Sequence, residues 1–207
     1  MRNSAPLQAK AFDIAMANFS GGTVLEFGVY GGENLGWYSS MLNEVSPESV
    51  LMGFDAWKGL PAETPGVFCP DCHSEGSIAG ASKEHVLQML ADDGLLRPNT
   101  KLVEGWFKDT LTPELAATIH NLAFVSIDVY LHSSTIEVLN FIWPLLQTGT
   151  VIWWDDWNAP QIGKTDGEYG ESRAWYEWIE VHTDIYPREI QWNEMNQRYF
   201  VMRKSTS

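Results

Sequence analysis

The chain has 207 residues, of which 44% are hydrophobic, and it carries a formal net charge of −14. This length suits one domain with a sizeable core, and the acidic balance disfavours nucleic acids and anionic membranes as partners because both require a basic surface. No apolar run approaches the ~20 residues that span a bilayer, and the first residues lack the pattern of a secretory signal, so we expect a cytoplasmic protein.

Strand and helix patterns alternate along the chain. After a helix at about 6–19, strands are expected at 23–29, 49–55, 101–104, 122–129, 150–154, 184–192 and 198–203. Helices are expected between them at 33–43, 82–93, 113–120, 135–146 and 167–182. This alternation predicts a single α/β domain over 1–207. Its Rossmann-like sheet would have seven strands, mostly parallel, with helices on both faces and an antiparallel hairpin closed by a turn at 193–196. That is the methyltransferase variant of the fold.

A glycine-rich turn, EFGVYGG at 26–32, follows the first expected strand. Glycines between a strand and a helix let a ligand approach the backbone closely. Tyr30 stands where the dinucleotide fingerprint G-x-G-x-x-G has its second glycine, which disfavours a pyrophosphate cradle and a nicotinamide oxidoreductase. Glu26 suits the ammonium group of S-adenosylmethionine instead. An ordinary tight turn is the alternative for this motif alone.

An acid, Asp55, ends the second expected strand, about 20 residues after the glycine turn, where such residues hold ribose hydroxyls. A solvated loop aspartate is the alternative, but the turn and Asp55 together favour an adenosine-containing ligand. Trp57 is suited equally to stacking on adenine and to packing in the core.

A long segment at 56–81 is rich in Pro, Gly and Ser and has no clear period. Loops of this length inside a compact domain are usually functional lids. Cys69, Cys72 and His73 lie in it with the C-x-x-C-H spacing of covalent haem attachment. Haem is disfavoured because an export signal is missing. A redox pair is disfavoured because nothing in the sequence predicts a reactive thiol, and a zinc site because a fourth ligand is missing. Reduced loop cysteines are the simplest interpretation.

Three carboxylates are expected at one rim of the sheet. Asp128 ends the fourth strand, and Asp155 and Asp156 end the fifth. Neighbouring strands lie ~4.8 Å apart, and ligands of such sheets bind outside the carboxyl ends of the strands. The three acids would repel one another without a cation, and Mg²⁺ or Ca²⁺ prefers such oxygen ligands. Because strand residues alternate between faces, both Asp155 and Asp156 can be ligands only if the strand opens into a loop at Asp156. Helix-capping or solvated aspartates are the alternative.

The chain has ten tryptophans, and Trp153, Trp154 and Trp157 flank the acid pair. Flat apolar surface suits both a packed core and a stacking wall for an acceptor, so the sequence leaves both roles open.

Five segments, EFGVYGG, GFDAWKGLP, VEGWFKDTL, SIDVYLHSST and GTVIWWDDW, occur in this order along the chain. Together they resemble the macrocin O-methyltransferase family, which comprises class I S-adenosylmethionine-dependent enzymes that methylate sugar hydroxyls of macrolides. The resemblance extends over 23–180. It departs from the family pattern I-D-x-D-x-Y-x-S-T after the fourth strand, where Tyr130 replaces the second acid and His132 replaces the tyrosine. These departures leave the base and the acceptor open.

The resemblance implies S-adenosylmethionine as cofactor, a divalent metal, usually magnesium, and a small hydroxylated acceptor, and it is consistent with a homo-oligomer. The expected cofactor residues are Glu26, Gly28, Tyr30, Gly31, Asp55, Trp57, Gly105, Trp106 and Phe107. The last three match the segment that borders the adenine in the family. The implied metal ligands are Asp128, Asp155 and Asp156.

These residues predict a metal-dependent O-methyltransferase. The metal would bind two neighbouring acceptor oxygens and lower the pKa of the attacking hydroxyl. His132, four residues after the catalytic Asp128, is the expected base, and His73 in the lid is the next candidate. A catechol-type methyltransferase is an alternative, in which the metal has the same role and the substrate is an aromatic diol. A non-catalytic S-adenosyl-ligand binding protein is the other alternative, but it would not need three rim carboxylates.

Overall fold

The computed structural model describes residues 5–67, 73–157, 166–192 and 197–205. Its centre is a seven-stranded sheet with the order β3-β2-β1-β4-β5-β7-β6. The parallel strands are β1 (Thr23–Phe27), β2 (Val50–Asp55), β3 (Thr100–Glu104), β4 (Leu122–Ile127) and β5 (Val151–Trp154). The antiparallel strands are β6 (Ile185–Trp192) and β7 (Arg198–Lys204). The predicted methyltransferase sheet with its antiparallel hairpin is therefore confirmed, while the 193–196 turn lies outside the described residues.

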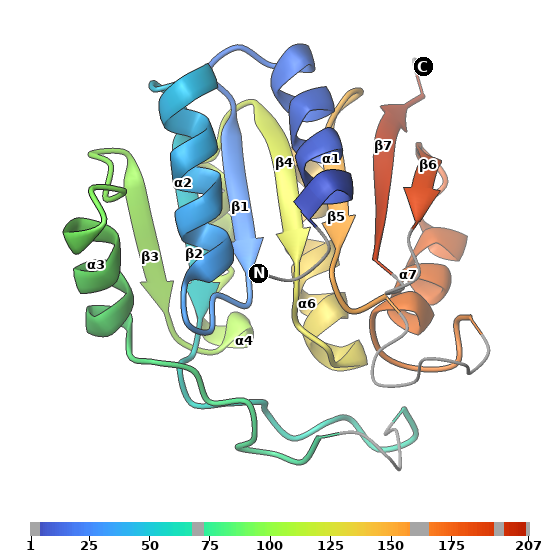
Figure 1. Ribbon diagram of the computed structural model, residues 1–207. Coiled ribbons are helices and arrows are strands. Elements are labelled where there is room, and N and C mark those ends of the chain that lie inside the picture. Colours follow the sequence, from blue (N-terminus) through green and yellow to red (C-terminus); the bar gives the residue numbers. More distant parts are fainter. Residues whose placement is uncertain (1–4, 68–72, 158–165, 193–196, 206–207) are drawn as a thin grey trace.

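Helices cover both faces of the sheet (Figure 1). One face carries α1 (Ala5–Asn18), α2 (Glu33–Val45) and α3 (Lys83–Asp92). The other carries α4 (Phe107–Thr110), α5 (Pro113–Ala116), α6 (His132–Ile142) with the 3₁₀ turn η1 (Trp143–Leu145), and α7 (Gly170–Val181). Strand residues alternate between the two cores, so that Trp153 packs on the α1 and α2 side and Trp154 on the α6 and α7 side.

Side-chain caps mark the starts of two helices. The Ser82 hydroxyl accepts a hydrogen bond from the His85 amide at 3.2 Å at the start of α3, and Thr112 caps α5 in the same way. Such side chains satisfy amide groups that have no partner within the helix. Several predicted bounds were wrong: α5 ends at Ala116 rather than at 120, α6 begins at His132 rather than at 135, and α7 begins at Gly170 rather than at 167. Strands β1 and β4 each end two residues earlier than predicted, at 27 and 127. The short helix α4 was not predicted.

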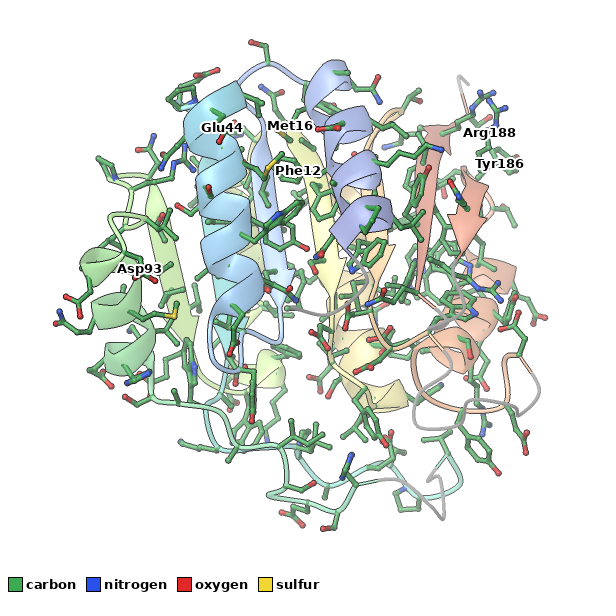
Figure 2. The ribbon with its side chains drawn as sticks, in the orientation of Figure 1. Phe12, Met16, Glu44, Asp93, Tyr186 and Arg188 are labelled. Atoms are coloured by element: carbon green, nitrogen blue, oxygen red, sulfur yellow. The ribbon has the colours of Figure 1, made fainter. Side chains whose placement is uncertain are left out.

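The N-terminal helix is fixed to the sheet by aromatic packing. Phe12 and Met16 lie between α1 and α2 (Figure 2). The Phe12 ring centroid lies 5.4 Å from that of Phe124 on β4 and 5.8 Å from that of Tyr38 on α2. Aromatic pairs at these distances add to the free energy of apolar burial. Helix α1 is therefore an integral layer of the fold.

The parallel strands all end at one edge of the sheet, and residues 56–67 and 73–81 lie beneath that edge (Figure 1). The described residues of the 56–81 segment contain no helix or strand. Two backbone hydrogen bonds hold it together, from Leu60 N to Ser77 O at 2.8 Å and from Gly76 N to Leu60 O at 2.9 Å. Cys69 and Cys72 lie outside the described residues. Among the described helices, none has the length and apolar character needed to cross a membrane.

Candidate active site

Gly28, just after β1, lies against the backbone of Asp128, just after β4. Its φ is +86°, and a Cβ there would lie 2.9 Å from the carbonyl carbon of Asp128 and nearer still to its oxygen. The Gly28 amide donates to Phe54 O at 2.9 Å, and the Asp128 amide donates to Phe27 O at 3.0 Å. Only glycine accommodates both this backbone conformation and this contact. The glycine turn and the first rim acid are thus in direct contact.

Asp55 ties the glycine turn to the end of β2. Its Oδ2 accepts hydrogen bonds from the amides of Val29 and Tyr30, each at 2.9 Å, and its Oδ1 accepts one from the Trp57 amide at 2.6 Å. Tyr30 and Trp57 have φ values of 52° and 50°, and the Trp57 indole Nε1 donates to Tyr30 O at 3.2 Å. Non-glycine residues with positive φ are uncommon, and here the Asp55 carboxylate holds two of them in place.

The remaining expected cofactor residues lie next to these strand ends. Gly31 precedes Gly32, the N-cap residue of α2. Gly105 follows β3 with a φ of 139°, and its amide donates to Asp55 O at 3.0 Å. Trp106 and Phe107 come next, and the Phe107 ring packs on the core. These positions therefore gather at the ends of β1, β2 and β3.

Glu26 is fully buried, and neither of its carboxyl oxygens has a hydrogen-bond partner among the described residues. Burial, reinforced by the negative charges of Asp55, Asp155 and Glu33, raises the pKa of Glu26 well above its usual value. A buried polar group without a partner is destabilising. Its position beside the glycine turn suits a ligand with a hydrogen-bond donor or a positive charge.

The three rim acids form one cluster. Asp128, Asp155 and Asp156 each offer a carboxylate oxygen, and these oxygens lie within 4.8 Å of one another. Strand β5 ends at Trp154, and although the Asp155 amide still donates to Ile127 O at 3.0 Å, Asp156 lies outside the strand. That removes the restriction that strand geometry would impose on two adjacent ligands.

The surroundings of the cluster suit a cation. Burial of Asp128, with the negative charges of Asp155 and Asp156 next, raises the pKa of its carboxyl well above the usual value. The side chain of Asp155 is oriented by Gln197 Nε2 at 2.7 Å and Trp153 Nε1 at 3.3 Å, which both donate to its Oδ1. Three such oxygen ligands are the donor set that Mg²⁺ and Ca²⁺ prefer.

A fourth carboxylate, Glu171 in the first turn of α7, was missed by the sequence analysis. It is fully buried. Its Oε1 accepts from the amides of Val129 at 3.1 Å and Tyr130 at 3.4 Å, and its Oε2 accepts from the Asp156 amide at 3.2 Å. Burial and the charge of Asp156 raise its pKa well above the usual value, although the amide bonds oppose this. Acids are common in first turns of helices, so the sequence carried no distinguishing signal.

His132 is the first residue of α6 and points toward α7. Its Nε2 lies 2.7 Å from Glu177 Oε2, and Arg173 Nε donates to Glu177 Oε1 at 2.7 Å. Although partial burial opposes it, the hydrogen bonds from Arg173 and His132 lower the pKa of Glu177. The other ring nitrogen, Nδ1, is buried and has no hydrogen-bond partner among the described residues.

The 56–81 segment contacts the loop that follows β4 and the first turn of α6. Glu63 Oε1 accepts a hydrogen bond from the Ser133 amide at 3.2 Å, and the His73 ring centroid lies 5.3 Å from that of Tyr130. Tyr130, at the position of the missing second acid, has a φ of 66°. Both contacts hold the segment against the stretch of chain that follows Asp128.

The tryptophans around the acid pair belong to the core. Trp153, Trp154 and Trp157 are fully buried. The Trp154 and Trp157 ring centroids lie 5.2 Å apart, and that of Trp157 lies 5.3 Å from Phe200. Of the two roles left open by the sequence, core packing is therefore the correct one for these three residues.

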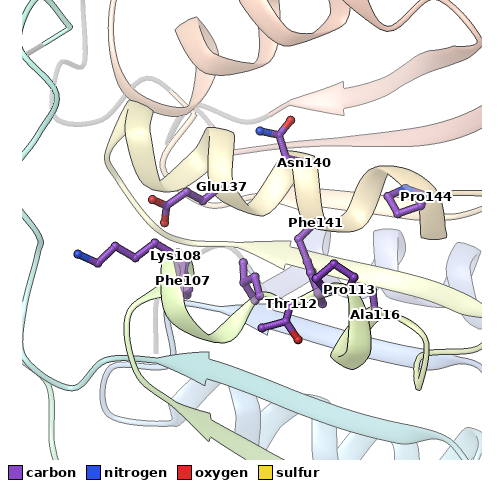
Figure 3. Close-up of a pocket in the computed structure, with 10 residues that line it drawn as sticks. Phe107, Lys108, Thr112, Pro113, Ala116, Glu137, Asn140, Phe141 and Pro144 are labelled. Atoms are coloured by element: carbon purple, nitrogen blue, oxygen red, sulfur yellow. The ribbon is translucent and has the colours of Figure 1, made fainter.

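A separate cavity of about 340 Å³ lies between α4, α5 and α6 (Figure 3). Its lining includes Phe107, Phe141 and Pro113, with Lys108 and Glu137 carrying the charges. None of the three rim acids lines it. This cavity is thus distinct from the acid cluster.

Comparison with known proteins adds independent findings. The family model described as Macrocin-O-methyltransferase (TylF) matches residues 5–180. Demethyldecarbamoylnovobiocin O-methyltransferase of Streptomyces niveus is 29% identical over 107 residues, which cover 50% of this chain and 40% of that protein. The matched part is therefore less than half of the relative's length.

Two solved structures share the fold. The O-methyltransferase NovP has a TM-score of 0.76 and 23% identity, covering 95% of this chain and 77% of NovP. The calicheamicin methyltransferase CalS11 has a TM-score of 0.73 and 22% identity, covering 94% of this chain and 77% of CalS11. At these identities the likeness shows a common methyltransferase fold.

Proposed function

The chain belongs to the macrocin O-methyltransferase family, and from this membership we propose that it transfers a methyl group from S-adenosylmethionine to a hydroxyl of a small molecule. The observation that carries the proposal is the contact between Gly28 and Asp128, which joins the cofactor turn to the acid cluster. The novobiocin and calicheamicin names of its relatives favour an acceptor of the natural-product class. A sugar hydroxyl is the proposed attacking group, because the family that the chain belongs to is one of sugar O-methyltransferases.

The cofactor would occupy the ends of β1, β2 and β3. Glu26, with two buried carboxyl oxygens that have no partner among the described residues, would receive the ammonium group. Asp55 Oδ1 accepts one backbone hydrogen bond and has capacity for a ribose hydroxyl. The backbone of Gly28, Tyr30 and Gly31 would line the methionine part. The adenine of the cofactor would lie against four residues: Trp57, Gly105, Trp106 and Phe107.

Asp128, Asp155 and Asp156 would hold a divalent cation, with Mg²⁺ the first candidate and Ca²⁺ fitting the same oxygens. When bound, such a cation binds acceptor oxygens and lowers the pKa of the attacking hydroxyl. The three side chains orient the acceptor toward the cofactor methyl group, and orientation alone supplies much of the rate. Residues 56–81 would exclude water as the lid of this single domain.

His132 is the proposed general base. Donation from its Nε2–H to Glu177 leaves the lone pair on Nδ1. This atom would accept the hydroxyl proton, and because it is buried, the residues that cover it would have to move when the acceptor binds. The Glu177 carboxylate would stabilise the resulting imidazolium, as an acid paired with a catalytic histidine does. His73, beside Tyr130, is the second candidate.

Transfer of labelled methyl groups tests this function. Sugars, glycosides and aromatic diols are offered as acceptors with Mg²⁺ or with excess chelator. We expect methyl transfer to a sugar hydroxyl in the presence of Mg²⁺, and we expect excess chelator to abolish this transfer. Asp128→Asn should also abolish it, whereas Asp93→Asn, an exposed change at the end of α3 (Figure 2), should leave it intact. Transfer to aromatic diols alone would favour the catechol-type alternative. Cofactor binding without transfer to any acceptor would favour the non-catalytic one.

A further inference from the structure

Glu171 connects three elements that meet at the acid cluster. It belongs to α7, while the amides bonded to its carboxylate belong to the loops after β4 and β5. Val129 and Tyr130 immediately follow Asp128, and the third amide is that of Asp156 itself. One buried side chain therefore fixes the backbone at two of the three proposed metal ligands.

The bonding pattern requires a carboxylate. Two amides donate to Oε1 and one to Oε2, so both oxygens act as acceptors. A glutamine has the same length but offers one acceptor oxygen and a donor NH₂ group. In either orientation the NH₂ group would face an amide N–H, so one of the two loops would lose its attachment. An aspartate keeps both oxygens, but it is shorter by one methylene group and cannot reach both loops at once.

We infer that Glu171 is a positioning residue, which sets the spacing of Asp128 and Asp156 and thereby the affinity of the acid cluster for a divalent cation. The inference rests on the proposed metal site. Residues that orient metal ligands typically change metal affinity by about 10- to 100-fold when they are replaced. A purely structural acid at a helix N-terminus would instead contribute to stability alone, through the helix dipole.

The experiment measures Mn²⁺ binding to the full chain by the electron paramagnetic resonance signal of free Mn²⁺, because Mn²⁺ suits the same oxygen ligands. Wild type is compared with Glu171→Gln, Glu171→Asp and Glu180→Gln. Glu180 is exposed on the same helix and provides the matched control. Binding of S-adenosylmethionine is measured by calorimetry for each variant, and thermal unfolding reports whether each has folded.

We expect both Glu171 variants to bind Mn²⁺ about 10- to 100-fold more weakly, with cofactor affinity unchanged and Glu180→Gln like wild type. If Glu171→Gln does not fold, Glu171→Asp decides. Wild-type Mn²⁺ affinity in a folded Glu171 variant overturns the inference and leaves the proposed metal site standing. Equal weakening of Mn²⁺ and cofactor binding also overturns it, because that indicates a general structural role. A wild-type chain that binds no Mn²⁺ overturns both the metal site and the inference.

Discussion

Replacement of Gly28 by alanine tests the close contact on which the site is built. The added Cβ would lie 2.9 Å from the Asp128 carbonyl carbon and nearer still to its oxygen, inside the 3.0 Å limit that real Cβ atoms essentially never cross. Both partners are backbone atoms, so neither can rotate away. The ends of β1 and β4 must therefore separate, and Asp128 must move with its strand.

The cost can be worked from the backbone. A φ of +86° disfavours an L-residue by about 1–2 kcal/mol. Separation of the ends of β1 and β4 would weaken the hydrogen bond from Asp128 N to Phe27 O, which contributes about 1 kcal/mol. Gly28→Ala should therefore lower the free energy of unfolding by about 2–3 kcal/mol, a large part of the 5–15 kcal/mol typical of a domain.

Urea denaturation of wild type, Gly28→Ala and Gly94→Ala measures this effect. Gly94 has a φ of +69°, and a Cβ there meets no atom within 4 Å. Its replacement by alanine therefore measures the free-energy cost of the positive φ without that of a close contact. We expect Gly94→Ala to cost about 1–2 kcal/mol and to leave Mn²⁺ binding intact, whereas Gly28→Ala should weaken it. Equal destabilisation by the two substitutions would refute the argument that backbone contact with Asp128 requires glycine.

Three further predictions concern single side chains. Because the pKa of buried Glu26 is raised above 4.5, the folded protein holds a proton that the unfolded chain releases, and stability falls as pH rises above that value. Glu26→Gln should therefore be more stable than wild type above pH 4.5 and equal below it in thermal unfolding; no difference at neutral pH would contradict this. Asp55→Ala should weaken cofactor binding about 10- to 100-fold by calorimetry, the loss expected for hydrogen bonds to a charged group, and an unchanged dissociation constant would remove Asp55 from the site. His132→Ala should lower turnover by about 10²–10⁴ and Glu177→Gln by less, with cofactor affinity unaffected; a wild-type rate in His132→Ala would exclude it as the base.

The sequence predicted the sheet and its rim well, because strand periodicity and the ends of strands are local features. Asp128 and Asp155 come together because parallel neighbours end at the same edge, a rule that requires no knowledge of side-chain packing. The glycine turn was recognised for a similar reason, although the specific contact between Gly28 and the Asp128 backbone appears only in three dimensions.

Other features depend on contacts between distant segments. Glu171 lies 42 residues from Val129, to which it is bonded, and nothing in its own helix reveals that partner. The bond between His132 and Glu177 likewise depends on how α6 packs against α7. Trp154 was ambiguous for a different reason, since a buried indole and a substrate-facing indole follow the same sequence pattern.

A crystal structure with S-adenosylhomocysteine and Mn²⁺, in which the metal is located by its anomalous scattering, tests the central claim most directly. We expect an anomalous peak among the carboxylates of Asp128, Asp155 and Asp156, with the cofactor ribose at Asp55, at the end of β2. Cofactor density without a peak at this cluster, or a peak at other ligands, would contradict the proposal that these acids hold the cation that activates the acceptor.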